Sequence, residues 1–316
     1  FQRWHDSRLA CLALPCAIVL VGTALRFYDL GAESYWHDEI ITLRLAGNGV
    51  AAAIDAFLRH GRPPLHVLLI SLWVDLLGVS EFASRSLSAF ASIASLALMF
   101  SVGREVFGSR VGILGATLMA MSDFQIWYAQ ETRYYALLLM LSLLSWLFYA
   151  RSTKSRDLAT LVSYVVVTVL MSYTHHGGFF ILLAQTLHFF CVPLCRGSGV
   201  RKSLSRPTIV AQVLAYVLAS PLLITTLQGT RTGIFGSGYS IPDYGIGALL
   251  LTPFRYVAGE YPSWAAVAAA SGLLVIGIST FLVQIGRDAW CASVRQLPRT
   301  VRRRLATDRQ LRLVAI

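Results

Sequence analysis

The sequence predicts an all-α polytopic membrane protein, and three observations lead to this prediction. Hydrophobic residues make up 56% of the chain and charged residues only 14%, whereas soluble domains carry about 25% charged residues. The mean hydropathy is +0.61. Apolar runs follow one another along the chain, and basic residues recur in every second turn between them. These patterns are typical of a bundle of membrane-crossing helices.

The apolar runs differ in length, and the length decides which of them cross the membrane. A helix needs roughly 20 apolar residues to cross a bilayer. The runs 65–79 and 246–258 are short and contain Asp75 and Arg255. We therefore expect these two runs to lie on the outer face as juxtamembrane helices. The remaining runs predict about eight spans: 9–28, 86–103, 111–122, 135–150, 159–174, 177–195, 208–227 and 264–286.

The basic residues set the expected orientation of these spans. They cluster near the amino terminus, in alternate turns and in the tail: Arg3, Arg8, Arg104, Arg110, Arg151, Lys154, Arg156, Arg196, Arg201, Lys202, Arg206, Arg287, Arg295, Arg299, Arg302, Arg303, Arg304, Arg309 and Arg312. Placing these clusters in the cytoplasm satisfies the positive-inside rule. Membrane topology then explains the formal net charge of +11, and we expect no nucleic-acid partner.

The spans define one transmembrane module over residues 1–289, with long outer loops at about 29–85 and 228–263. Residues 290–316 form a basic segment that we expect on the cytoplasmic side. Because the segment ends on LRLVAI, which is apolar again, we expect it to lead into further spans and the chain to be a fragment. No internal repeat is evident, so the inverted-repeat signature of many transporters is missing.

Five polar stretches fall on the predicted outer face. They are WHDEIITLR at 36–44, RHGRPPLH at 59–66, YAQETRYYAL at 128–137, YTHHGGF at 173–179 and PFRYVAGEYP at 253–262. Ionisable groups at membrane depth are energetically costly and are therefore suspected of function. Together the stretches predict a site for an anionic, lipid-linked substrate, in which a carboxylate acts as base and arginines hold a phosphate.

Simpler explanations exist for each stretch. The acid pair can cap the helix that follows it, and the two adjacent prolines fit a helix start. The paired tyrosines suit an aromatic belt at the membrane surface, and Arg133 can snorkel or pair with Glu131. The adjacent histidines can bind a metal, but neighbouring residues on a helix point about 100° apart and rarely share one ion.

The order of the motifs resembles a known family. A W-x-D-E loop is followed by R-P-P-L, S-E-F-A-x-R, G-R-x-x-F-G, Y-A-Q-E-x-R-Y-Y-A-L and Y-T-H-H-G-G-F. This ordered set resembles the GT-C glycosyltransferases of the protein O-mannosyltransferase and aminoarabinose-transferase branch, often described as family-39-type. The resemblance covers residues 10–195 and is loose beyond position 200. It implies a GT-C-type helical bundle.

The resemblance also implies an activity: a sugar is moved, with inversion, from a polyprenyl-phosphate donor to an acceptor on the non-cytoplasmic face. It implies Asp38 as base, with Glu39 orienting the substrate or Asp38. Arg133 and Tyr134 match the segment near the carrier phosphate. The complete expected set is Asp38 and Glu39 for catalysis; Arg133, Tyr134, His175, His176 and Arg255 for the donor phosphate; and His37, Arg62, His66, Glu131 and Tyr256 for other substrate contacts.

The expected partners are a lipid-linked donor, a glycan, lipid or protein acceptor, and membrane lipids. No cofactor is required by this chemistry, although Asp38 and Glu39 offer part of a site for a divalent metal. The expected location is a bacterial inner membrane, with the site on the periplasmic or extracellular face. Two alternatives remain: a transporter or flippase of lipid-linked glycan intermediates, and a non-catalytic subunit for envelope assembly.

Overall fold

A computed structural model of the chain describes residues 2–155, 157–195 and 206–231, and every regular element in these ranges is a helix. The helices are α1 (Gln2–Phe27), α2 (His37–Gly47), α3 (Gly49–His60), α4 (Leu65–Leu77), α5 (Glu81–Phe107), α6 (Ser109–Ala120), α7 (Asp123–Ala129), α8 (Tyr135–Ser152), α9 (Leu158–Thr174), α10 (Gly177–Cys195) and α11 (Arg206–Arg231). The protein is an all-α polytopic membrane protein, as the composition predicts.

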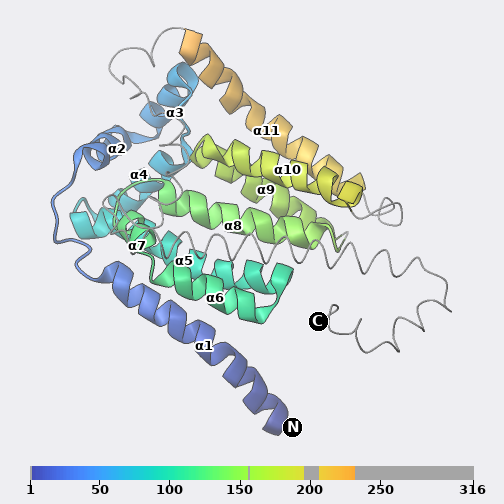
Figure 1. The fold of residues 1–316 in the computed structure, drawn as a ribbon. Coiled ribbons are helices and arrows are strands. Elements are labelled where there is room, and N and C mark those ends of the chain that lie inside the picture. Colours follow the sequence, from blue (N-terminus) through green and yellow to red (C-terminus); the bar gives the residue numbers. More distant parts are fainter. Residues whose placement is uncertain (1, 156, 196–205, 232–316) are drawn as a thin grey trace, which may run out of the picture. The chain divides into compact units, whose positions relative to one another are not determined.

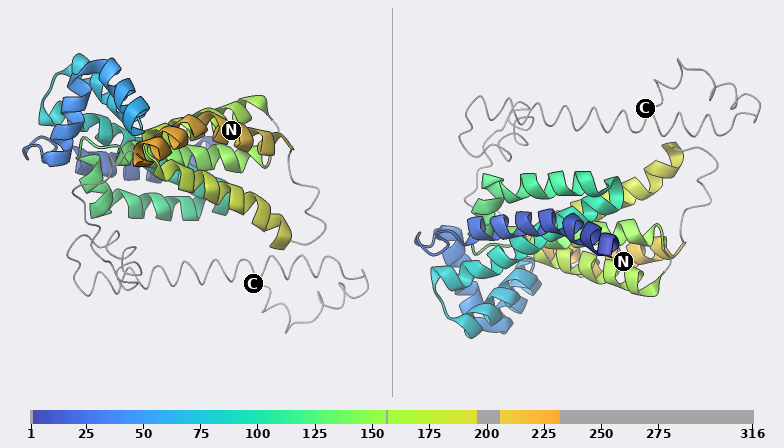
Figure 2. Two further views of the ribbon diagram at one scale, coloured as in Figure 1. Left: turned by 90° about the horizontal axis from the view of Figure 1, so that it is seen from above. Right: turned by 90° about the horizontal axis from the view of Figure 1, so that it is seen from below.

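Contacts within the chain define two units. Phe1–Gln185 with Ser205–Tyr244 form the first, which contains every contact discussed below, and the second includes the end of α10. In the first unit, α5 packs against α1, α4, α6 and α8, while α8 packs against α9 and α9 against α11. The short helices α2, α3 and α4 gather at one end of these long helices (Figures 1 and 2). That end holds the start of α8 and the ends of α9 and α11 (Figure 1).

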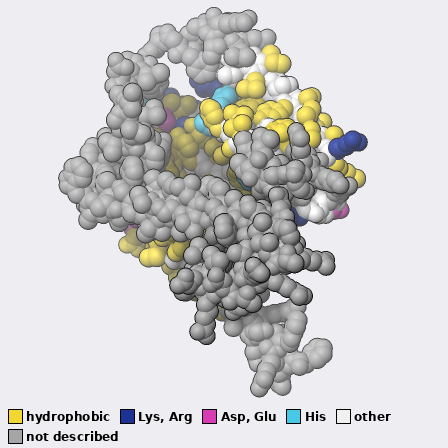
Figure 3. Space-filling view, turned by 45° about the vertical axis from the view of Figure 1, so that its right-hand side comes forward, with side chains coloured by type: hydrophobic (Ala, Val, Ile, Leu, Met, Phe, Trp, Pro, Cys, Tyr) yellow, Lys and Arg dark blue, Asp and Glu magenta, His cyan; other side chains and the backbone are white. Residues whose placement is uncertain are grey.

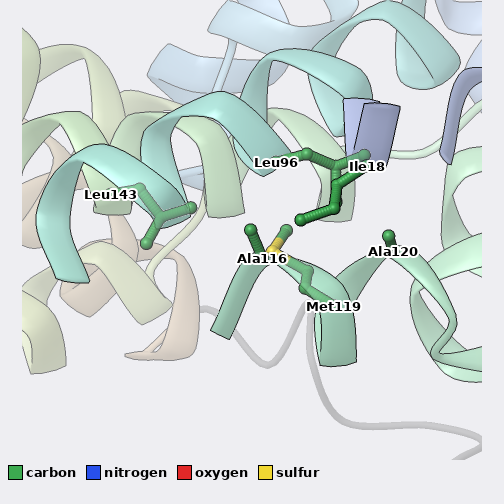
Figure 4. Close-up of a cluster of buried hydrophobic side chains, with 6 residues drawn as sticks. All are labelled: Ile18, Leu96, Ala116, Met119, Ala120 and Leu143. Carbon is green, nitrogen blue, oxygen red and sulfur yellow. The ribbon is translucent and has the colours of Figure 1, made fainter. Parts of the chain in front are cut away.

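Two alanines and four larger apolar side chains form a core where α1, α5, α6 and α8 meet. Six buried residues make up this cluster (Figure 4): Ile18, Leu96, Ala116, Met119, Ala120 and Leu143. Alanine and glycine at helix contacts let backbones approach closely, which favours association in a membrane. The outward faces of the same helices carry exposed apolar residues, such as Leu20 and Leu118, as expected for surfaces that lipid covers.

The predicted spans coincide with helices wherever the chain is described. Within the described ranges, three helices are long and apolar enough to cross a membrane: Glu81–Phe107, Tyr135–Ser152 and Arg206–Thr226. Shorter apolar helices match the predicted spans 9–28, 111–122, 159–174 and 177–195, and also the juxtamembrane run 65–79. The predicted span 264–286 and the predicted helix 246–258 lie outside the described residues. The number of eight crossings therefore stays a prediction.

Helix α6 ends earlier than its apolar run. The guanidinium of Arg26, which is fully buried, donates to the carbonyls of Met119 and Ala120 at 3.2 Å each. It also donates to Ser92 Oγ at 2.7 Å. The last carbonyls of a helix have no partner within the helix, so Arg26 satisfies two of them from α1. Chain direction changes after Met121, and α7 begins at Asp123.

Two glycines bring α5 and α6 into backbone contact. A Cβ atom added to Gly112 would lie 2.6 Å from the carbonyl oxygen of Phe100, and one added to Gly103 would lie 2.6 Å from Gly112 Cα. In both cases the atom met belongs to the backbone, which cannot turn aside as a side chain can. Glycine at these positions therefore sets how closely the hairpin of α5 and α6 closes.

Gly112→Ala is expected to lower the free energy of unfolding by about 1–2 kcal/mol, because the added methyl group forces the two helices apart. Gly115→Ala on the same helix is the matched control, since its Cβ would meet only the flexible side chain of Met99, at 3.4 Å. Unfolding in mixed micelles measures both variants. Equal stability of the two variants would contradict the close-contact interpretation.

Candidate active site

A pocket of about 370 Å³ lies where α2, α3 and α4 meet the ends of the long helices. Four of the polar stretches contribute to its lining, together with the apolar residues Leu45, Ala53, Ala56 and Val67. The lining residues from the four stretches are Asp38, Ile41, Thr42, Arg62, Pro63, Pro64, His66, Arg133, Tyr134, Thr174, His175 and His176. Histidine, basic and acidic side chains are visible around a hollow on this face (Figure 3). The expected convergence of these stretches at one end of the bundle is therefore confirmed for the described residues.

Asp38 is the only carboxylate among the residues that line the pocket. It lies in the first turn of α2, and its Oδ2 atom is 3.3 Å from Nη2 of Arg133. Nη1 of Arg133 also donates to the Asp38 carbonyl at 3.3 Å and to Thr42 Oγ1 at 3.1 Å. Arg133 therefore holds the start of α2 through both the carboxylate and the backbone carbonyl of Asp38. The alternative pairing of Arg133 with Glu131 does not form.

Aromatic rings surround the Arg133 guanidinium. Its central carbon lies 4.9 Å from the ring centroid of Tyr134 and 5.9 Å from that of Tyr135. Such rings attract a cation electrostatically and shield it from water. The Nε atom of Arg133 is buried and has no hydrogen-bond partner. One donor of this cation therefore has no hydrogen-bond partner among the described residues.

Glu39, next to Asp38, has entirely different surroundings. It is fully buried and accepts hydrogen bonds from Arg85 Nε at 3.0 Å, Arg85 Nη2 at 2.8 Å, the Thr132 amide at 2.8 Å and the Trp36 amide at 3.3 Å. Burial by itself would raise the pKa of Glu39, but these donors and the charge of Arg85 outweigh it and lower the pKa. The bond from Trp36 confirms the capping interpretation for this acid.

His66 is buried beneath the pocket, with an exposed fraction of 3%, and its Nε2 atom has no partner. Burial and the charge of Arg133 lower the pKa of His66 to about 3, so the ring is neutral at physiological pH. A buried polar atom without a partner calls for an explanation. Because His66 lines the pocket, a bound ligand is the explanation that we favour.

His175 and His176 have different hydrogen-bond partners. Nδ1 of His175 accepts from the Gly177 amide at 3.0 Å, which leaves the proton of the neutral ring on Nε2. The ring stacks on Tyr134 with centroids 4.5 Å apart. Nε2 of His176 instead lies 3.2 Å from the Gly61 carbonyl and 2.9 Å from Thr226 Oγ1. Burial lowers the pKa of both histidines.

The segment before α4 presents Arg62 to the pocket. Gly61 has φ +62°, and a Cβ atom there would lie 2.5 Å from Thr226 Cα, so both conformation and space require glycine. Pro63 and Pro64 follow, and α4 begins at Leu65, which confirms the prediction of a helix start. Arg62 is exposed and lines the pocket, and no side-chain partner is described for it.

Among the described residues, His37 and Glu131 were also expected in the site but do not line the pocket. His37 is exposed on α2. Glu131 is 7% exposed, accepts from Trp127 Nε1 through one oxygen and has no partner for the other. Arg255 and Tyr256 lie outside the described residues. Sequence reasoning missed Arg85, Thr42 and Thr132, although Arg85 is the one basic residue in the S-E-F-A-x-R motif.

The donor set does not fit a metal ion. Both oxygens of Glu39 are occupied by Arg85 and by backbone amides, and Asp38 is paired with Arg133. Among the described residues, no three His, Cys, Asp or Glu side chains are arranged as metal ligands. The carboxylates of Asp38 and Glu39 are therefore committed to arginines and backbone amides.

The fold and the pocket define a class of protein: a polytopic helical membrane protein with a polar, ligand-sized pocket at one end of its bundle. A family model of dolichyl-phosphate-mannose-protein mannosyltransferases matches residues 61–225, which is just over half of the 316 residues. The chain belongs to this family and is a membrane glycosyltransferase of the GT-C type. A comparison with curated proteins found no match. The matched segment begins at Gly61 and therefore does not include Asp38.

Proposed function

We propose that the protein transfers a sugar from a polyprenyl-monophosphate carrier to an acceptor hydroxyl, with inversion and with Asp38 as general base. The observation that carries the proposal is the composition of the pocket. In the described part of the chain, one carboxylate lies beside an arginine paired with it, an arginine without a described side-chain partner and three histidines. This set can accept one proton and hold one anion.

The pocket matches an amphiphilic donor. Its polar residues gather around Asp38 and Arg133, while α2, α3 and α4 supply an apolar wall made of Ile41, Leu45, Ala53, Ala56 and Val67. The lowered pKa values of its histidines keep them neutral. The two arginines and one aspartate then leave a single positive charge, which one phosphodiester neutralises. A diphosphate carrier brings one negative charge more.

The reaction needs few groups. The acceptor oxygen attacks the anomeric carbon on the side opposite the phosphate, and the carbon–oxygen bond to the phosphate breaks with its electron pair on the phosphate oxygen. Asp38 takes the proton of the hydroxyl group. The positive side chains stabilise the charge that remains on the polyprenyl phosphate. The products are an inverted glycoside and the free carrier phosphate.

The arrangement of charges supports a site on the non-cytoplasmic face. Glu105 at the end of α5 pairs with Arg151 in the last turn of α8 at 4.0 Å and with Lys154 in the turn that follows at 2.7 Å. This basic region lies at the ends of α5 and α8 remote from the pocket (Figure 1). Basic turns favour the cytoplasm, so we propose that the pocket faces the periplasm or the exterior of a bacterial inner membrane.

The test uses the purified chain in liposomes with a sugar-labelled donor and an envelope extract that contains protein, lipid and glycan acceptors. We expect label transfer from a polyprenyl-monophosphate sugar at a rate at least about tenfold above that from the diphosphate analogue, a difference of roughly 1.4 kcal/mol. A nucleotide sugar is expected to give no transfer.

Two results would contradict the proposal. Movement of the intact labelled donor across the bilayer without release of sugar would instead identify a flippase. A labelled donor that stays intact and does not cross the bilayer would identify a non-catalytic assembly subunit. Asp55→Asn is expected to keep wild-type transfer, since Asp55 forms an exposed ion pair with Arg59 and does not line the pocket.

A further inference from the structure

The ion pair of Glu39 and Arg85 is unusual because every hydrogen-bonding group in it is used. Arg85 donates to Glu39 through Nε and Nη2, and its remaining N–H groups reach the carbonyls of Leu30 at 3.3 Å, Glu33 at 2.8 Å and Ser34 at 3.2 Å. Glu39 accepts four bonds in turn. Both side chains are buried, with exposed fractions of 6% for Arg85 and 0% for Glu39.

This pair joins four segments of the chain. Arg85 belongs to the first turns of α5, and its three carbonyl partners lie in the loop after α1. Glu39 belongs to α2, and the amide of Thr132 belongs to the turn before α8. The pair therefore fixes the outer loop and α2 onto the end of the bundle.

Its position in the sequence gives the pair a consequence for the pocket. Asp38 precedes Glu39 directly, and Arg133 follows Thr132 directly. The bond from the Thr132 amide to Glu39 Oε1 therefore fixes the backbone of Asp38 relative to the backbone of Arg133. The contact between Asp38 Oδ2 and Arg133 Nη2, at 3.3 Å, depends on this relative position.

We propose that Arg85 is a positioning residue that acts through Glu39, for which the resemblance implies only that it orients the substrate or Asp38. Both residues then act on transfer only through the placement of Asp38 against Arg133. This inference rests on the proposed role of Asp38. Glu39 cannot itself accept a proton or a ligand without breaking this network, and neither residue lines the pocket. Replacement of a buried ion pair by apolar residues is often neutral for stability, so stability alone gives no reason for the pair.

A double-mutant cycle tests the proposal. Glu39→Asp keeps the charge but shortens the side chain by one methylene, which shifts α2 relative to the turn before α8. We expect a fall in kcat of about 10- to 100-fold, since misplacement by about 1 Å has effects of this size. The KM for the donor is expected to change less than about threefold, because the pair does not touch the donor.

The same change in an Asp38→Asn background is the decisive comparison. If Glu39 acts through Asp38, Glu39→Asp there is expected to lower the residual kcat by less than about threefold. An equal loss in both backgrounds would overturn the inference, while the proposed function would stand. Arg85→Lys gives a second variant with the charge retained, and Asp55→Glu changes an exposed ion pair as the control.

Hydrogen exchange gives a readout that does not depend on activity. The amides of Trp36 and Thr132 donate to Glu39 in the native protein, so Glu39→Asp is expected to speed their exchange while α8 and α9 keep their protection. Failure of the wild-type protein to transfer sugar would overturn the proposed function. Hydrogen exchange at these two amides would then still test whether Glu39 and Arg85 position the start of α2. Unchanged exchange at both amides would overturn that role.

Discussion

Asp38→Asn is expected to lower kcat for sugar transfer by about 10³-fold, because a general base typically contributes 10²- to 10⁴-fold. Asparagine keeps the shape of the side chain but cannot take the proton of the acceptor hydroxyl. The KM for the donor is expected to change little, since the carboxylate acts on the acceptor. Initial rates with the labelled polyprenyl-monophosphate sugar in liposomes measure both constants.

Asp55→Asn provides the matched control for this prediction. Asp55 is exposed on α3 and pairs with Arg59 one turn away, and such pairs contribute only about 0.2–1 kcal/mol. We expect its kcat to equal that of the wild-type protein. A wild-type kcat for Asp38→Asn would exclude Asp38 as the base. A rise in KM alone would show instead that Asp38 binds the donor.

The sequence predicts where the site lies better than it predicts the task of each residue. Successive spans cross the membrane in alternate directions, and the basic turns favour the cytoplasm, so the polar stretches fall at one face. Four of these stretches contribute residues to one pocket. Those rules need only hydropathy and charge, both of which can be read directly from residue types. The helix starts at Leu65 and Tyr135 follow equally local signals.

The partners of individual charges could not be read in this way. Glu39 and Arg85 are 46 positions apart in the sequence, and the contact between them depends on the path of the loop after α1. Arg133 is two residues from Glu131 but pairs with Asp38 across the pocket. Partners of this kind follow from tertiary packing, for which a single sequence carries no local signal.

The end of α6 shows the same limit in the bundle. Its apolar run continues beyond Ala120, but the helix stops where Arg26 takes the last carbonyls. Arg26 is the basic residue in the last turn of α1. Its complete burial follows from the packing of α1 on α5 and α6.

Glu131→Gln is expected to stabilise the protein above pH 7 and to have little effect near pH 4. Burial raises the pKa of Glu131 from its usual 4.5 to about 7, against the opposing bond from Trp127. The folded protein therefore binds a proton that the unfolded chain has lost between these pH values, and stability falls as the pH rises through this window. At about 1.4 kcal/mol per pKa unit, the cost of ionisation approaches roughly 3 kcal/mol.

Unfolding in mixed micelles between pH 4 and pH 9 measures this difference. We expect the gain from Glu131→Gln to grow from near zero at pH 4 to about 1–3 kcal/mol at pH 8, because an amide carries no charge to bury. Glu33→Gln is the control, since the side chain of Glu33 is exposed. The variants share all other titrating groups with the wild-type protein, so these cancel in the comparison. A gain independent of pH would show that Glu131 does not titrate in this window, and that its unpartnered oxygen remains ionised in the fold.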